Sequence, residues 1–210
     1  MTRIPWLALC VGLLAASSAS ATTFSFHCLS GDGGGECAIP AEELWVDVDD
    51  LGGGEISFTL HNESSVRSSI AELYFDDAAG LLASLVAVID GPGVDFEIGA
   101  SPGNLPSGTV EGFDADWVFG AEHPKPRHGV GPGEELTVVF SLVEGTSFSD
   151  LIAAMEAGAV RVGLHAPPFG NHGNKSFVTG ARVPVPTPEP GTLALLALAL
   201  AAAVVRSKRT

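Results

Sequence analysis

The stretch EISFTLH, residues 55–61, alternates between apolar and polar side chains without a break. In an extended chain successive side chains point to opposite sides, so Ile56, Phe58 and Leu60 share one face and the polar residues share the other. This pattern predicts a β-strand that buries one face in a core and leaves the other face in water.

The same period of two recurs along the chain and predicts about nine strands. Segments rich in Gly and Pro separate them, as expected for turns between antiparallel strands. The predicted fold class is all-β, an antiparallel β-sandwich that is jelly-roll-like or immunoglobulin-like. The other strand segments are LWVDV (44–48), AELYF (71–75), LASLVAVID (82–90), VDFEI (94–98), FDADWVF (113–119), ELTVVFSLV (135–143), VRVGLHA (160–166) and KSFVT (175–179).

One segment, TSFSDLIAAMEAG (146–158), has a helical rather than a strand pattern. Ser147 and Asp150 have the spacing of a capping box, although the second place of that box usually holds Glu or Gln. Gly158 is a residue that commonly ends a helix. We therefore predict one short helix between two strands, with an apolar side that packs on the core.

Both ends of the chain have the character of processing segments rather than of the fold. Residues 1–21 predict a secretory signal helix: a basic start at Arg3, a short apolar run, and an A-x-A cleavage site at residues 19–21. Residues 22–181 are the predicted secreted β domain. Residues 182–187 are rich in proline and predict a stiff, extended linker.

The C-terminal segment, residues 188–210, combines three features in order. The triplet Pro188, Glu189 and Pro190 precedes the hydrophobic span 191–205, which predicts a helix about 22 Å long. A basic tip follows directly and should remain cytoplasmic, so the β domain would lie on the outer side of the membrane. The basic residues of the tip are Arg206, Lys208 and Arg209.

This C-terminal segment resembles the PEP-CTERM sorting signal, which is found in Gram-negative bacteria that make exopolysaccharide. The resemblance implies that exosortase, an integral-membrane cysteine protease, is the partner that processes the chain near Pro188–Pro190. It also implies that the protein is held in the inner membrane only transiently and is then released to the envelope or the extracellular space. The alternative is a permanent single-span protein with a proline-rich stalk.

Cys28 and Cys37 flank a glycine-rich loop and are the two cysteines that remain after removal of the signal peptide. In an oxidising compartment they are expected to form a disulfide. A metal-binding or redox pair is the alternative, although no second cysteine pair or C-x-x-C motif supports it.

The formal net charge is −15. Such an acidic chain lacks the basic surface that nucleic-acid binding requires, so no nucleic-acid partner is expected. The same acidity raises the possibility of calcium, although the segment from Asp47 departs from an EF-hand loop at two ligand positions. The weak calcium candidates are Asp47, Asp49, Asp76, Asp77, Asp114 and Asp116, against solvated acidic turns as the alternative.

Motifs for catalysis are missing from the sequence: it has neither a G-x-S-x-G elbow nor an H-E-x-x-H motif. We therefore expect a non-enzymatic exported protein associated with extracellular polysaccharide, with no cofactor. A carbohydrate-binding or calcium-stabilised module and a hydrolase are the alternatives. Trp45, Trp117 and Tyr74 are candidates for a sugar-binding face, although Trp117 falls on the apolar side of its strand. Four histidines late in the chain could converge on a metal ion, although no two of them have the spacing of ligands on one helix. They are His123, His128, His165 and His172.

Overall fold

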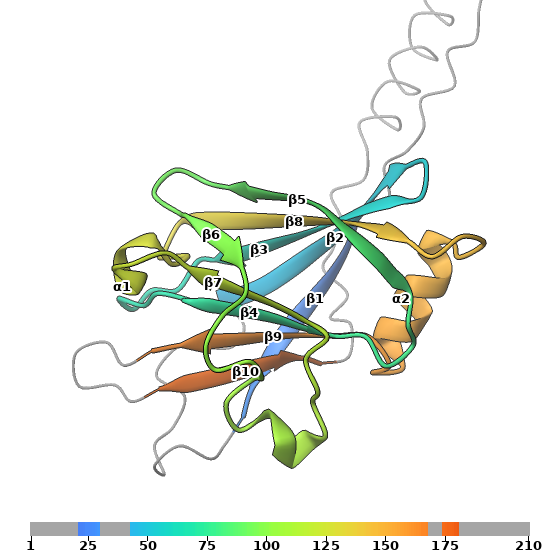
Figure 1. The fold of residues 1–210 in the computed structure, drawn as a ribbon. Coiled ribbons are helices and arrows are strands. Elements are labelled where there is room, and N and C mark those ends of the chain that lie inside the picture. Colours follow the sequence, from blue (N-terminus) through green and yellow to red (C-terminus); the bar gives the residue numbers. More distant parts are fainter. Residues whose placement is uncertain (1–20, 30–42, 168–173, 181–210) are drawn as a thin grey trace, which may run out of the picture.

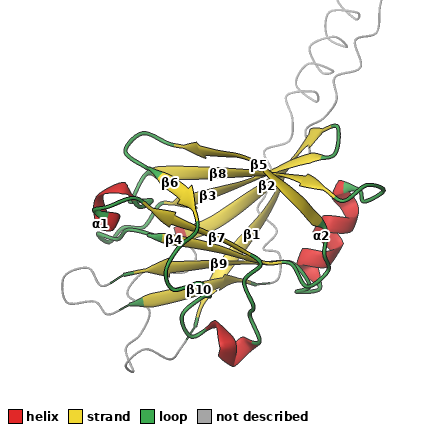
Figure 2. Ribbon diagram, in the orientation of Figure 1, coloured by secondary structure: helices red, strands yellow, loops and turns green. Residues whose placement is uncertain are grey.

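The computed structural model describes residues 21–29, 43–167 and 174–180, and these residues form ten strands with short helices at the periphery (Figures 1 and 2). The helical elements are η2 (Gly108–Glu111), α1 (Lys125–His128) and α2 (Phe148–Glu156). The strands are β1 (Ala21–Cys28), β2 (Leu44–Gly52), β3 (Glu55–Asn62), β4 (Glu72–Asp76), β5 (Leu82–Asp90), β6 (Phe96–Ile98), β7 (Trp117–Ala121), β8 (Glu134–Leu142), β9 (Arg161–Ala166) and β10 (Lys175–Thr179).

All ten strands belong to one antiparallel sheet, in the order β5-β8-β3-β2-β1-β10-β9-β4-β7-β6. The strand β1 joins its two halves: Ser25 pairs with Trp45 of β2, whereas Phe26 pairs with Thr179 of β10. We call β5-β8-β3-β2 with the start of β1 the first half-sheet. The second half-sheet is the end of β1 with β10-β9-β4-β7-β6.

The sheet curls until it is nearly a barrel. The strands at its two ends, β5 and β6, are consecutive in the chain, and the Phe96 backbone N–H donates to Asp90 Oδ1 at 3.0 Å between them. The expected antiparallel all-β class is therefore confirmed. The expected sandwich is not confirmed, because β1 links the two halves into one continuous sheet. The strand β1 was not predicted from the sequence.

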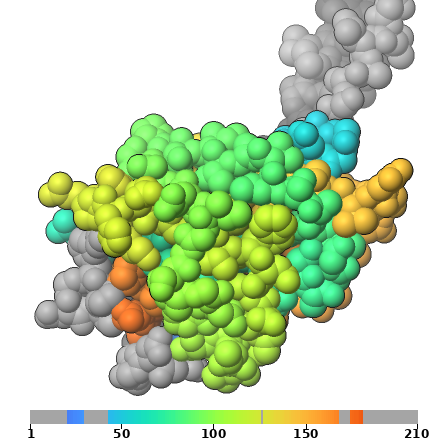
Figure 3. All heavy atoms as spheres, in the orientation of Figure 1, coloured from blue at the N-terminus to red at the C-terminus, as the bar shows by residue number. Residues whose placement is uncertain are grey.

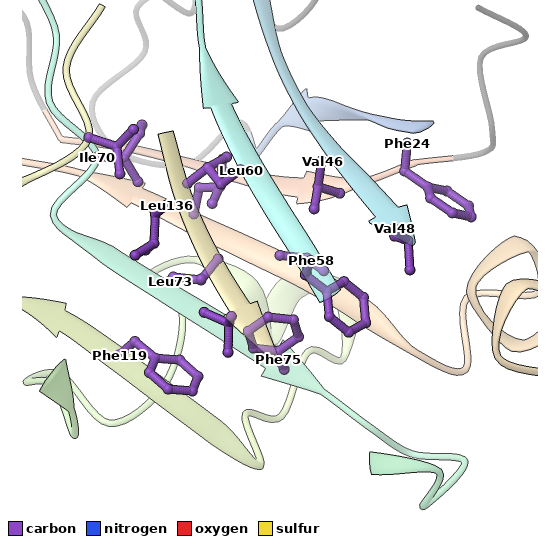
Figure 4. Packing of buried hydrophobic residues seen from close by; sticks show 14 of the residues in the cluster. Phe24, Val46, Val48, Phe58, Leu60, Ile70, Leu73, Phe75, Phe119 and Leu136 are labelled. Atoms are coloured by element: carbon purple, nitrogen blue, oxygen red, sulfur yellow. The ribbon is translucent and has the colours of Figure 1, made fainter. Parts of the chain in front are cut away.

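The core lies between the two half-sheets and is built from the alternating apolar residues. Ile56, Phe58 and Leu60 of the EISFTLH segment are each no more than 1% exposed. Their side chains meet Leu73 and Phe75 of the opposite half-sheet (Figure 4). The inward face predicted for β3 is therefore confirmed, and the apolar residues that alternate along β2, β8 and β9 are buried in the same way.

Phe140 of β8 occupies the centre of an aromatic cluster. Its ring centroid lies 5.0 Å from that of Phe75, 5.2 Å from that of Trp117 and 6.0 Å from that of Phe58, all in edge-to-face geometry. Such pairs contribute about 0.5–1.5 kcal/mol each beyond the burial of their area. Trp117 is thus part of the core packing, as its position on the apolar side of its strand predicts.

The outer face of the second half-sheet is covered by residues 99–116, which we call the cover segment. Leu105 and Phe113 of this segment pack with Tyr74 of β4 in a second apolar cluster. Added to Gly163 of β9, a Cβ would lie 2.8 Å from a methyl carbon of Leu105, so a larger residue there would force the Leu105 side chain to move. The green segment in Figure 3 includes these residues and forms much of the visible face.

Because of this cover, the strand β4 is buried on both faces. The alternation of AELYF predicts that Glu72 and Tyr74 face water, and this prediction is wrong: Glu72 is 4% exposed and Tyr74 is fully buried. The hydroxyl of Tyr74 donates to the carbonyl of Pro102 at 3.2 Å. The predicted strand 113–119 also begins later, at Trp117, since Phe113 belongs to the cover segment.

The helix α2 forms where the sequence predicts it. The Ser147 side chain accepts from the backbone N–H of Asp150, and the Asp150 carboxylate accepts from the backbone N–H of Ser147 at 2.9 Å, which completes the capping box. Leu151 and Met155 are the buried residues of its apolar side. Gly158 follows with a φ of 73°, a backbone angle that favours glycine.

Candidate functional site

The outer face of the first half-sheet carries a row of side chains that crosses four strands. Ser25 of β1 is the register partner of Trp45 of β2, which pairs with His61 of β3, which pairs with Glu135 of β8. These four residues lie opposite the buried positions of their strands and are all at least partly exposed. The row therefore presents an aromatic centre with polar neighbours to solvent.

Trp45 and His61 form a stacked pair at the centre of this row. Their ring centroids are 5.1 Å apart and their planes differ by 18°. His61 Nε2 lies 3.2 Å from Asp47 Oδ2, and His61 Nδ1 lies 3.7 Å from Glu135 Oε2. The imidazole is thus held on one face by the indole and at both nitrogens by carboxylates.

Asp47 of β2 contacts several members of this cluster. Its carboxylate accepts a hydrogen bond from the hydroxyl of Thr23, and hydrogen bonds from His61 and Trp45 also reach it. The hydrogen bond from His61 is the largest cause of the lowered pKa of Asp47, against the opposing effect of partial burial. For Asp49, burial first and the nearby charge of Asp47 second raise the pKa.

A pair of threonine hydroxyls lies beside the aromatic pair. The Thr59 and Thr137 hydroxyls are 2.9 Å apart, and Thr59 is the register partner of Asp47. Next to Ser25, the backbone N–H of Gly180 donates to the Ser25 carbonyl at 3.0 Å. Ser25, a small residue, is the register partner of Trp45 on the strand opposite to that of His61. Flat apolar area beside hydroxyl and carboxylate groups is suited to polar ring compounds with apolar faces.

Of the three aromatic residues predicted as a sugar-binding face, Trp45 alone lies on this outer face. Tyr74 lies beneath the cover segment, and Trp117 packs against Phe140 in the core. Sequence reasoning missed His61, Thr59 and Glu135 as partners of Trp45. The alternation predicted that these residues face outward, but only the strand register places them beside Trp45.

The calcium candidates near β4 act as anchors for loops. The Asp76 carboxylate pairs with Arg161, whose Nε lies 3.1 Å from Oδ2. Asp77 accepts from the backbone N–H groups of Leu81 and Leu82 at 3.0 and 2.8 Å.

The last two calcium candidates lie opposite this pair of aspartates. Asp116 Oδ2 accepts from the backbone N–H of Asp77 at 2.7 Å, and the backbone N–H of Asp114 donates to Asp76 Oδ2 at 3.3 Å. Within the described ranges, no group of three or more His, Cys, Asp or Glu side chains is arranged to hold a metal ion. Asp76, Asp114 and Asp116 therefore tie the cover segment to the end of β4, whereas the Asp77 carboxylate binds the turn before β5.

The histidines that sequence analysis considered lie at separate places. His165 is buried in β9, with Nδ1 3.0 Å from the Ser176 hydroxyl. His128 ends α1, and its Nδ1 lies 4.0 Å from Asp95 Oδ2. His123 is exposed after β7, and His172 lies outside the described residues.

Several sequence predictions fall on residues outside the described ranges. Cys28 lies at the end of β1, but Cys37 is not among the described residues, so the disulfide stays a prediction. The same holds for the signal peptide up to residue 20, the linker and the C-terminal segment. None of the helices in the described part of the chain has the length and apolar character needed to cross a membrane.

Residues 186–209 match the family model of the PEP-CTERM protein-sorting motif. The chain carries a PEP-CTERM sorting motif. The motif implies exosortase as the processing partner, and it implies export through the membrane to the cell envelope. Neither the curated proteins nor the solved structures contain a match to this chain.

Proposed function

We propose that this protein is an exported, non-catalytic component of the envelope or extracellular matrix of a Gram-negative bacterium. In this proposal exosortase removes the C-terminal segment, and the released β domain associates with extracellular polysaccharide. The PEP-CTERM motif at residues 186–209 carries the proposal, because it is a signal for protein sorting that follows an acidic, β-rich domain.

The physical role of the motif follows from its order. The span 191–205 is shorter than the roughly 20 residues that cross a membrane unaided, so snorkelling of its flanking residues or local thinning of the bilayer covers the difference. Prolines at 188 and 190 keep the backbone extended and remove two N–H donors, which leaves the triplet accessible to a protease. Glu189 adds a charge that keeps the cleavage region in water.

The test replaces the triplet in the full-length chain with Pro188→Ala, Glu189→Gln and Pro190→Ala. We expect the unaltered protein to lose its C-terminal segment and the variant to remain in the inner membrane with its C-terminus intact. Cell fractionation and mass spectrometry of the mature C-terminus measure both results. Pro184→Ala, which lies outside the matched residues, is the control and should be processed normally. An unaltered protein that still ends at Thr210 in the envelope would contradict the proposal and favour a permanent anchor.

The outer face around Trp45 favours a second candidate function, which is direct binding of a saccharide by the β domain. The Trp45–His61 stack, the Thr59–Thr137 hydroxyl pair and Asp47 combine apolar and hydrogen-bonding groups on one sheet face. A sugar ring needs both, since its C–H faces are apolar and its rim carries hydroxyls.

Binding of the full-length protein to a panel of glycans tests this candidate. We expect Trp45→Ala to abolish binding and Trp45→Phe to retain part of it. Val110→Ala is the matched control, because Val110 is an apolar residue that is 81% exposed on η2, away from this face. Equal losses for Trp45→Ala and Val110→Ala would rule out a specific site at Trp45.

A further inference from the structure

The strands that form the first half-sheet contain no lysine or arginine. Histidines are the only basic side chains in β1, β2, β3, β5 and β8, which otherwise hold acidic, polar uncharged and apolar residues. In the described part of the chain, the lysines and arginines lie in the second half-sheet, in α1 and in the loop before β4. They are Arg67, Lys125, Arg127, Arg161 and Lys175.

Three carboxylates give the outer face around Trp45 a negative charge. Asp47 and Glu135 flank His61, and Asp49 lies two residues beyond Asp47 on the same face of β2. The side chain of Glu135 is 58% exposed and that of Asp47 is 29% exposed, so a molecule on this face meets both. Burial first, and the charge of Asp47 second, raise the pKa of Asp49.

The basic side chain of this row is not open to an acidic ligand. His61 Nε2 lies 3.2 Å from Asp47 Oδ2, and Nδ1 lies 3.7 Å from Glu135 Oε2. The indole of Trp45 stacks on the ring at 5.1 Å. An anion that approaches either nitrogen of His61 therefore meets a carboxylate. Even a protonated His61 balances only one of its two acidic neighbours.

Hydroxyl groups provide the other hydrogen-bonding side chains on much of this face. Thr59 and Thr137 form one pair at 2.9 Å, and the Ser84 and Ser141 hydroxyls form another at 2.7 Å where β5 meets β8. A hydroxyl both donates and accepts, so it can bond the hydroxyls of a sugar. It brings no positive charge that would pair with an acidic sugar.

We propose that the face around Trp45 selects an uncharged polysaccharide and rejects acidic ones, and that Asp47, Asp49 and Glu135 set this specificity. The inference rests on the saccharide-binding candidate above and adds the charge class of the ligand. The apolar face of the indole packs on a neutral or an acidic sugar ring alike, so the aromatic pair alone does not discriminate. A carboxylate on the sugar meets like charges, which oppose binding.

A second copy of this chain is a poorer occupant of the same face. In a symmetric dimer one patch contacts the same patch of the other copy. The carboxylates of the two copies would then face each other, and these strands have no lysine or arginine to pair with them. An uncharged polysaccharide avoids this repulsion.

Calorimetric titration of the full-length protein tests the charge class, in a polyoxyethylene detergent because such detergents contain no sugar. The probes are two matched pairs of β-1,4-linked hexasaccharides, in which the members of a pair differ only at C6. They are cellohexaose with its glucuronate counterpart, and mannohexaose with its mannuronate counterpart. At about 20 mM salt we expect a neutral member to bind saturably and its acidic counterpart about tenfold more weakly or worse.

Added salt supplies a second measurement with the same probes. At about 0.5 M salt the difference within a pair should narrow, because exposed charges are screened. Equal affinities within each pair at low salt would overturn the inference and leave the saccharide candidate standing. Absence of binding for all four probes would also overturn the inference, whereas the glycan panel above decides the saccharide candidate separately.

Reversal of one charge on the face should admit the acidic probes. Glu135→Lys is expected to raise the ratio of acidic to neutral affinity about tenfold, and Asp49→Asn should raise it less because it removes one charge without adding another. Asp114→Lys, at an exposed position of the cover segment, changes the net charge as Glu135→Lys does and should leave the ratio unchanged. Thermal melting of each variant checks that the fold is retained.

Two further outcomes would overturn the proposal. Equal effects of Glu135→Lys and Asp114→Lys would show that the net charge of the molecule, and not this face, controls the choice of ligand. Analytical ultracentrifugation of the same samples without sugar measures self-association. A dimer that Trp45→Ala converts to a monomer would assign the face to a second copy of the chain.

Discussion

Each half-sheet carries a row of mostly polar residues on its outer face, but the two rows differ in how far their residues are buried. On the first half-sheet the row remains at the surface. On the second half-sheet His165 and Glu72 are 6% and 4% exposed, because the cover segment lies over their strands. The first row is Ser25, Trp45, His61 and Glu135; the second is Ser176, His165, Glu72, Gly120 and Glu97.

The comparison teaches that a polar residue on an alternating strand is not thereby a surface residue. Burial makes the polar groups of Glu72 and His165 depend on partners, which are Lys125 for Glu72 and Ser176 for His165. On the open face water supplies any missing partner. Changes beneath the cover segment should therefore cost more stability than matched changes on the open face, and four predictions test this.

The largest effect is expected for Phe113→Ala in the cover segment. Phe113 is 2% exposed and packs with Tyr74, so its truncation leaves a cavity that costs about 3–5 kcal/mol of unfolding free energy. Urea denaturation followed by tryptophan fluorescence measures it. Val110→Ala, on the same segment but 81% exposed, should change stability by no more than about 0.5 kcal/mol. Similar small losses for both variants would mean that the cover segment contributes little to the fold.

Next in size is Arg161→Ala, which removes an ion pair between β9 and β4 together with the hydrogen bonds that hold the cover segment to β9. The guanidinium pairs with Asp76 and also donates to the carbonyls of Glu111 and Gly112 at 2.9 and 2.7 Å. Since the arginine side chain is 17% exposed, we expect a loss of about 2–3 kcal/mol, below that of a fully buried pair.

A double-mutant cycle with Asp76→Ala separates the ion pair from the other contacts of Arg161. The double variant should lose less stability than the sum of the two single variants, because both changes remove the same pair. Strict additivity would show that Arg161 and Asp76 do not stabilise each other.

Removal of single hydroxyls gives a smaller contrast between the two faces. Tyr74→Phe deletes a donor to the Pro102 carbonyl beneath the cover segment and should cost about 1 kcal/mol. Thr59→Val removes the hydroxyl pair with Thr137 on the open face, where water can replace it, and should cost no more than about 0.5 kcal/mol. Thermal denaturation compares them; a larger loss for Thr59→Val would reverse the argument.

The smallest effect concerns the pH dependence of stability on the open face. The folded-state pKa of Asp47 is lowered, so its stabilising contribution is present above the ordinary aspartate pKa of 3.8 and is lost as the pH falls through the lower folded value. Asp49 has a raised pKa and has the opposite sign, since protonation favours its folded state.

Urea denaturation between about pH 7 and pH 3 measures this pair of effects. Asp47→Asn should lower stability at neutral pH and reduce the loss on acidification, whereas Asp49→Asn should raise stability at neutral pH. Changes of the same sign for the two variants would contradict the opposite pKa shifts.

Local patterns were sufficient to predict much of the fold and part of the candidate sites. Phe58 and Phe140 were placed inward by alternation, and Ser147 and Asp150 identified the start of α2 by their spacing. Trp45 was correctly assigned to an outward face. The partners of Trp45 were not predicted, because His61 and Glu135 reach it only through pairing of strands that are distant in sequence.

By itself the sequence determined which face of most strands is apolar, where α2 begins, and which sorting motif the C-terminal segment carries, because each of these depends on neighbours within a few residues. Tertiary structure decided that β1 joins both halves of the sheet and that the cover segment buries Tyr74 and Glu72. These outcomes depend on contacts between segments tens of residues apart. Their free energies come from burial and register, which no local pattern of residues specifies.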